Sequence, residues 1–269
     1  IPVPGPPAQN NLDPADFRAA GWDDQHIVLA QRLAMRGQEA LLPHTLMMDF
    51  GAFLPREYYT RADADVFVNT VHARPCHHAR QLWRLFKAAG AARDRIALHA
   101  HGLAGIAPEA ELAARFATYL AFLQREAGLH PPALVPTIAI ETSPPGTPSA
   151  AIEAALARQL AGLAAQHRAA GPAPPPALYG LAASGPLVAL AAYNPADEAV
   201  APDGSRTPAA LAALGVFDLR NDAHDVWTAL ALAMFACHAR NVAWLAAART
   251  GRGWAPPGPG AGAGADADA

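Results

Sequence analysis

The sequence predicts an α/β fold in which helices flank a mixed β-sheet. Three observations in the second half of the chain support this. A short β-branched run at 134–140, flanked by prolines, is typical of a buried strand. Apolar residues at helical spacing over 152–163 indicate a helix after it. Two apolar runs, 178–183 and 187–193, are separated by the Ser-Gly-Pro turn at 184–186 and indicate a hairpin or two adjacent strands. Strand, helix, strand and strand in this order favour a sheet covered by helices.

The first half of the chain is expected to be mostly helical. Asp13 and Pro14 place an N-cap before a proline at the first helical position, so a short helix begins there. A second helix is predicted to begin at 23–24, and 50–65 is expected to be a connector. The second helix carries Ile27, Leu33 and Met35.

Three more elements are predicted between 66 and 123. The short apolar run 66–71 indicates a strand. A helix is expected from His77 to Gly90, because glycine suits the left-handed residue that ends many helices. Another helix starts at 107–109, with acidic residues in its first turn. Its apolar stripe comprises Leu112, Phe116, Leu120 and Leu123.

The last part of the folded region is predicted to be a polar loop at 194–208 followed by a long helix at 222–248. Trp83, Trp227 and Trp244 lie on helical stripes, so they are expected in the core, with a partner surface formed by an exposed subset as the alternative. The apolar stripe of the long helix comprises Val226, Leu230, Met234, Cys237, Asn241 and Trp244.

Composition shifts divide the chain into four parts. A Pro-rich lead at 1–11 and a Gly/Ala/Pro tail at 251–269 are expected to be disordered. Between them lie a mostly helical portion at 12–132 and the sheet-containing core at 133–250. The length suits one α/β domain with extensions, or two poorly separated ones.

The charge pattern gives no footprint of a nucleic-acid binder. The formal net charge is −3, and the basic residues are 19 arginines and one lysine, Lys87, with no basic run among them. Nucleic acid therefore has no basic patch to bind.

Cysteine use and apolar runs bear on the compartment. With only Cys76 and Cys237 there is no disulfide framework, although one bridge between them stays open. No basic and apolar leader precedes the fold, and the longest apolar run, 226–237, is shorter than the roughly 20 residues that span a bilayer. We therefore expect a trimmed fragment of an intracellular protein, nuclear or cytoplasmic, without a membrane partner.

One segment resembles a known family. The run 136–143, Pro-Thr-Ile-Ala-Ile-Glu-Thr-Ser, is similar to the strand of the fungal PD-(D/E)XK nuclease-like family, in which an apolar run ends in Ile-Glu-Thr-Lys. The likeness continues through Gln159-Leu160 on a helix into 178–180 and 187–190, and 71–75 is similar to a Val-His-x-Pro segment upstream. It covers about 134–193 and extends more weakly to 248. The resemblance implies a restriction-endonuclease-like core in the part at 133–250.

The motif of this family has a clear chemistry. Two carboxylates at adjacent strand ends hold a divalent metal, and a lysine two residues after the glutamate orients the attacking water. If the chain were active, the resemblance would assign these roles to Glu141, Asp94 and Gln159, with Mg²⁺ as cofactor. The lysine position is Ser143, which carries no charge, and an arginine from elsewhere would differ in shape and rigidity.

The substitution at 143 predicts that the module has lost catalysis, so no catalytic residue, cofactor or metal is expected. We then expect the protein to be a scaffold component that binds another protein. The complex that it belongs to could be associated with nucleic acid. Two alternatives stay open, which are an active metal-dependent nuclease and an unrelated helical interaction protein.

A cluster of metal-capable side chains precedes the core. His72, Cys76, His77 and His78, with His99 and His101, fall within thirty residues. Structural zinc sites usually carry paired ligands at C-x2-4-C or H-x3-5-H spacing, and here only one cysteine is present. Ordinary polar contacts are therefore expected for these residues.

Overall fold

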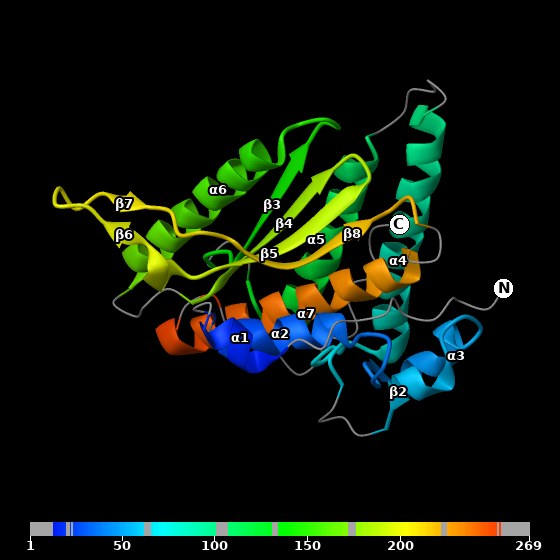
Figure 1. Ribbon diagram of the computed structural model, residues 1–269. Helices are drawn as coiled ribbons and strands as arrows, with labels where there is room; N and C mark the ends of the chain where they lie inside the picture. Colours follow the sequence, from blue (N-terminus) through cyan, green and yellow to red (C-terminus); the bar gives the residue numbers. More distant parts are fainter. Residues whose placement is uncertain are drawn as a thin grey trace.

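The computed structural model describes residues 13–19, 22, 24–61, 66–100, 107–130, 134–171, 176–221, 225–251 and 253. These residues form three layers, with one helix above a β-sheet and several helices below and beside it (Figure 1). The prediction of an α/β fold with a mixed sheet is confirmed. The terminal segments that were expected to be disordered lie almost wholly outside the described residues.

The main sheet has four strands in the order β3-β4-β5-β8. Strands β3 and β4 run parallel, because helix α6 connects them, whereas β4, β5 and β8 are antiparallel neighbours. Gly185, with φ 53°, makes the tight turn between β4 and β5 and confirms the predicted hairpin. The strands are β3 (Ile138–Ser143), β4 (Leu178–Ser184), β5 (Leu187–Tyr193) and β8 (Ala212–Asp218).

The lower face of the sheet is covered by helices from both halves of the sequence. Helix α7 (Asp225–Thr250) packs against α4 (Pro75–Ala100) and α5 (Pro108–Glu126), and α2 (Asp24–Ala34) lies against β8. Because one hydrophobic cluster joins these helices to the inward side chains of β4, β5 and β8, the two halves share a core.

Helix α7 is apolar on all sides rather than along one stripe. It is long and apolar enough to span a membrane, but 78% of its most apolar window is buried inside the protein, as in the core helix of a soluble fold. Trp227 is buried as predicted. The prediction is wrong for Trp83 and Trp244, which are 41% and 42% exposed, and Asn241 is exposed as well.

Helix α6 (Ser149–Ala170) alone packs on the upper face among the described residues, and it contacts β3 and β4. Its predicted stripe is largely confirmed, since Leu156 and Leu160 are buried in a second hydrophobic cluster above the sheet. The closest approach is over Gly180 of β4, where an added Cβ would lie 2.6 Å from Cδ2 of Leu156.

This close approach predicts that Gly180→Ala lowers the free energy of unfolding by about 1–3 kcal/mol, because the buried Leu156 side chain must move. The matched control is Gly162→Ala in α6, where nothing lies within 4 Å of the added Cβ. That change should raise stability by about 0.5–1 kcal/mol, since alanine favours the helix. Urea unfolding measures both, and equal effects would contradict the close packing of α6.

The other N-terminal elements complete the lower layer: residues of β1, α3 and β2 belong to the main hydrophobic core, and α1 packs against α2. Helix α1 begins where predicted, and the backbone N–H of Ala15 donates to Oδ1 of Asp13 at 2.8 Å. The predicted connector at 50–65 contains only short elements among its described residues. Besides α2, the elements before α4 are α1 (Pro14–Ala19), β1 (Leu42–Pro43), η1 (His44–Leu46), α3 (Met47–Phe50), η2 (Arg56–Tyr58) and β2 (Tyr59–Thr60).

Three predictions of local structure are wrong. Helix α4 continues through Gly90 to Ala100, because alanines and arginines follow and an interior glycine costs only about 1 kcal/mol. The run 66–71 is not a strand: the side chains of Glu126 and Arg240 bind the N–H of Val71 and the backbone oxygen of Asn69, and the N–H of Val68 donates to the backbone oxygen of Leu41 at 2.9 Å without forming a ladder. Strand β3 starts at Ile138 rather than 134, since Pro136 has no N–H to donate to a ladder.

The region before α7 also differs from the prediction. The loop 194–208 contains the 3-10 turn η5 (Pro195–Asp197) and a short hairpin of β6 (Ala199–Val200) and β7 (Arg206–Thr207). Strand β8 was not predicted at all. The two cysteines are free, with Cys76 exposed and Cys237 buried, so the bridge left open by the sequence does not form.

Candidate functional site

Strand β3 brings Glu141 to the upper face of the sheet. Successive side chains of a strand point to opposite faces of the sheet. Ile138 and Ile140 pack against the shared core on the lower face, so Glu141 and Ser143 point to the upper face, on the side of α6. Among the described residues β3 pairs only with β4, and it is therefore an edge strand. This geometry confirms that positions 141 and 143 share a face.

Both carboxylate oxygens of Glu141 accept hydrogen bonds from neutral groups. The Ser143 hydroxyl donates to Oε1 at 3.2 Å, and the side-chain amide of Gln159, from α6, donates to Oε2 at 2.5 Å. Ser143 is buried and Glu141 is half-buried. The contact places Gln159 beside Glu141, whereas the helical stripe of α6 left open whether this amide lies at the site or only at the edge of the core.

Asp94 lies elsewhere in the fold. It is on α4, its side chain is 68% exposed, and it forms an ion pair with Arg93 at 3.0 Å. The structure therefore brings Gln159 and Ser143 into contact with Glu141, whereas Asp94 takes no part in these hydrogen bonds. A pair of converging carboxylates, which a two-ligand metal site needs, is not formed by these two residues.

Part of the histidine cluster can also be placed. His78 is buried, and its Nε2 lies 3.1 Å from the hydroxyl of Tyr119. His72 and Cys76 are exposed, while the side chains of His99 and His101 lie outside the described residues. No group of three His, Cys, Asp or Glu side chains that could hold a metal occurs in the described part of the chain.

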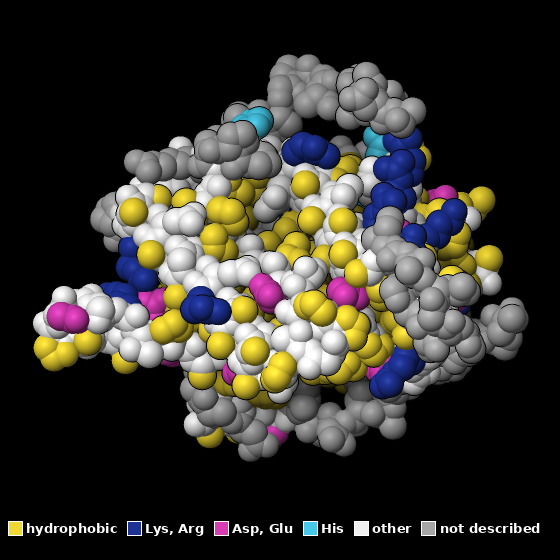
Figure 2. All heavy atoms as spheres, turned by 90° about the horizontal axis from the view of Figure 1, so that it is seen from above, with side chains coloured by type: hydrophobic (Ala, Val, Ile, Leu, Met, Phe, Trp, Pro, Cys, Tyr) yellow, Lys and Arg dark blue, Asp and Glu magenta, His cyan; other side chains and the backbone are white. Residues whose placement is uncertain are grey.

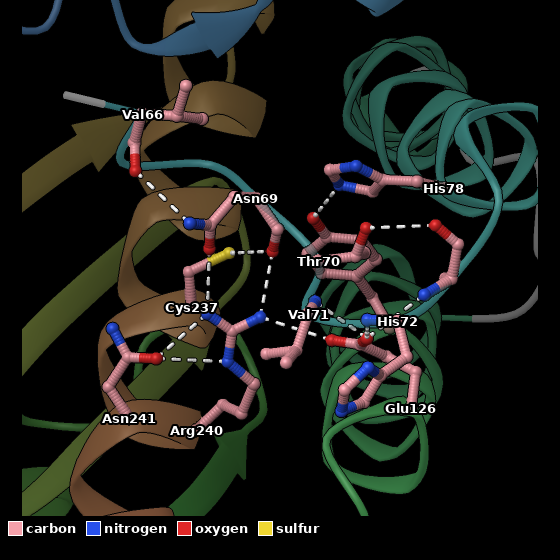
Figure 3. A network of polar contacts seen from close by, with 12 residues as sticks. Val66, Asn69, Thr70, Val71, His72, His78, Glu126, Cys237, Arg240 and Asn241 are labelled. Carbon is pink, nitrogen blue, oxygen red and sulfur yellow. Dashed lines mark hydrogen bonds and ion pairs between the residues drawn. The ribbon is translucent and has the colours of Figure 1, made fainter. Parts of the chain in front are cut away.

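A buried polar network links the end of α5 to the middle of α7 (Figure 3). Arg240 and Glu126 form an ion pair of 3.2 Å with side chains 3% and 7% exposed. Glu126 Oε2 accepts the backbone N–H groups of Val71 and His72 at 2.7 and 2.8 Å. Arg240 donates to the backbone oxygen and the side-chain oxygen of Asn69, both at 2.8 Å. This network holds the segment 66–73 between the two helices.

Burial sets the titration of the groups at the edge of this network. The pKa of His78 is lowered to about 4 by burial and by the positive charge of Arg240. Burial also raises the pKa of Tyr119 well above its usual range. Both side chains are therefore neutral at pH 7, and their positions are typical of a structural cluster rather than of an open reaction site.

An apolar groove lies beside α6 on the upper face of the sheet. It has a volume of about 550 Å³. Its floor is made by small side chains of three strands, and Ile152 and Leu156 of α6 form one wall. A hollow with hydrophobic side chains is seen near the centre of this face in Figure 2. Leu187 and Val216 stand at the groove, 46% and 64% exposed.

Sequence reasoning did not find this groove. The alternating small residues Gly180 and Ala182 in β4, and Ala189 and Ala191 in β5, were a readable signal, because they share one face of their strands. The third strand of the floor, β8, was missing from the prediction, so the width of the groove was not foreseeable.

The chain was also compared with known proteins. No family model matches it, and no significant match was found among the curated proteins or among the solved structures.

Proposed function

We propose that this chain is a non-catalytic module related to the PD-(D/E)XK nuclease-like proteins, and that it acts by binding another protein. The strand, helix and parallel strand β3-α6-β4 follow one another in the order that the resemblance implies. The observation that carries the loss of catalysis is the environment of Glu141, whose two carboxylate oxygens are bound by Ser143 and Gln159.

A divalent cation fits this environment poorly. Mg²⁺ is usually held by one or two carboxylates with waters or phosphate oxygens in octahedral geometry. Here the oxygens of Glu141 are engaged by hydrogen bonds, Asp94 is paired with Arg93 instead, and the position of the lysine that would face developing charge carries a hydroxyl. We infer no hydrolytic step at this site.

The apolar groove supports a binding role. Exposed Leu187 and Val216 lie with small half-buried side chains on one continuous concave surface, and such apolar patches mark interaction sites more often than single exposed residues do. The groove is apolar, the formal net charge of the chain is −3 and its sequence contains no basic run, so a protein is the preferred partner.

A nuclease assay tests the proposed function. Purified wild-type protein and the Glu141→Ala and Glu141→Gln variants are incubated with labelled single- and double-stranded DNA and RNA in Mg²⁺ or Mn²⁺. We expect the wild type to cut no faster than the variants. Metal-dependent cutting that Glu141→Ala abolishes would show an active nuclease and refute the proposal. The Glu141→Gln variant keeps the size of the side chain and controls for misfolding.

A further inference from the structure

The upper face of the sheet is only half covered. Helix α6 packs on β3 and β4, whereas the lower face bears α7, α5 and α2 along the width of the sheet. Over β5 and β8 the upper face instead carries the apolar groove. Within the described part of the chain, no element fills the second helix position of this layer.

The floor of the groove follows from the strand register. Ala182 of β4 is paired with Ala189 of β5, and Ala189 is paired with Val216 of β8. In the next row of side chains, Ala191 is paired with Ala213. These alanines project no further than Cβ, so an element lying on them can approach the sheet closely.

The dimensions suit one α-helix. Neighbouring strands are roughly 4.8 Å apart, so two strands span about the 10 Å diameter of a helix. The protein uses the same solution under α6, where Gly180 lets Leu156 approach the backbone of β4. A helix that carries apolar side chains on one face could therefore pack beside α6 and complete the layer.

The rim adds a charge preference. Glu153, on the exposed flank of α6, borders the groove, and it forms no ion pair with a described residue. Asp218, at the end of β8, is already bound by Arg220 at 2.5 Å. The open acidic charge therefore lies on the α6 side, where it would attract a lysine or arginine of the bound segment.

From this geometry we infer that the groove binds an amphipathic helix of a partner protein, with Leu-, Val- or Ala-sized residues on its buried face and a basic residue beside Glu153. This inference rests on the proposed function and deepens it, because it names the surface and the kind of partner. A strand added to the edge of β8, or a second copy of the chain, would be different occupants with different signatures.

The test uses three fluorescently labelled peptides and the full chain. One is an amphipathic helix of about five turns with a Leu/Ala face and lysines elsewhere. The second replaces its lysines by glutamates, and the third has the composition of the first in strict alternation, which favours a strand. Binding is followed by fluorescence anisotropy. We expect the basic helical peptide to bind more tightly than the other two.

Variants locate the binding. Ala189→Trp fills the floor and Val216→Glu places a charge at the exposed lip, and each should weaken binding of the basic helical peptide about tenfold or more. Glu153→Lys should reverse the preference between the basic and acidic helical peptides. Val200→Glu, at an exposed position on β6 away from the groove, is the matched control and should change nothing. Circular dichroism confirms that each variant is folded.

Three outcomes would overturn the inference: no binding of either helical peptide, preference for the alternating peptide, or helical binding that neither Ala189→Trp nor Val216→Glu weakens. Sedimentation of the free protein identifies self-association through the groove, which would also overturn it. These failures differ from a failure of the proposed function, because nuclease activity abolished by Glu141→Ala is measured without any peptide.

Discussion

Arg240→Met is expected to lower the free energy of unfolding by about 3–5 kcal/mol, which is the usual cost of removing one partner of a buried ion pair and leaving the other charged. The substitution keeps most of the side-chain length but removes the guanidinium. Glu126 is then left with a buried charge, and Asn69 loses both of its bonds to Arg240. Because these contacts hold the segment 66–73 between α5 and α7, the loss should also expose that segment to hydrogen exchange.

Urea unfolding of the single and double variants measures this effect. Arg240→Met combined with Glu126→Gln should cost less than the sum of the two single changes, since the unpaired charge is then removed. The control is Arg18→Ala, which breaks the exposed ion pair with Asp24, where the side chains are 60% and 78% exposed. It should cost less than about 1 kcal/mol. Similar losses for Arg240→Met and Arg18→Ala would contradict a buried network.

Acid should destabilise the protein through His78 between about pH 6.5 and pH 4. In the unfolded chain this imidazole has its ordinary pKa of 6.5, whereas burial and Arg240 lower its folded pKa to about 4. As the pH falls through this window the unfolded state takes up a proton that the folded state cannot, so stability decreases. A pKa unit corresponds to about 1.4 kcal/mol, which makes the total loss about 3 kcal/mol by pH 4.

The measurement is the free energy of unfolding as a function of pH in wild type and in His78→Gln. Glutamine can still contact the Tyr119 hydroxyl but does not titrate, so the difference between the two curves isolates His78 from the carboxylates. Parallel curves for wild type and His78→Gln would show that His78 is protonated equally in the folded and unfolded states.

The sequence predicted the elements whose signal is local. Asp13 and Pro14 marked the start of α1, and the stripes of α5 and α6 appeared at the expected spacing. The turn at Gly185 predicted a hairpin or two adjacent strands, and β4 and β5 form the hairpin because so short a turn suits antiparallel pairing. In each case the preference of a few neighbouring residues agreed with the final packing.

The errors fall where packing overrode local preference. Gly90 carries a helix-ending signal, but the contacts of α4 with α5 and α7 stabilise the continuous helix by more than one glycine costs. Strand β8 contains Gly215 and small residues, so its pattern is weak, and pairing with β5 fixes it as a strand. The apolar run 66–71 was predicted to be a strand from its composition. That prediction failed because the side chains that hold the run lie far away in sequence, on α5 and α7.

The candidate site divides in the same way. Glu141 and Ser143 were placed on one face by the alternation of a single strand, and this required no tertiary information. Sequence spacing alone also showed that the residue two positions after Glu141 is a serine, which carries no charge. The contact between Gln159 and Glu141 depended on how α6 lies over β3. The placement of Asp94 on an exposed flank of α4 likewise came from the path of that helix.

By itself, the sequence of this protein determined the α/β class, the order of the strands around α6 and the uncharged residue two positions after Glu141, because these depend on residues close together in the chain. Only the tertiary structure decided which carboxylates stay apart, how Arg240 and Glu126 clamp the segment 66–73, and that the floor of alanines is open beside α6. These features depend on the register and packing of elements far apart in sequence, and periodicity within a single element carries no information about them.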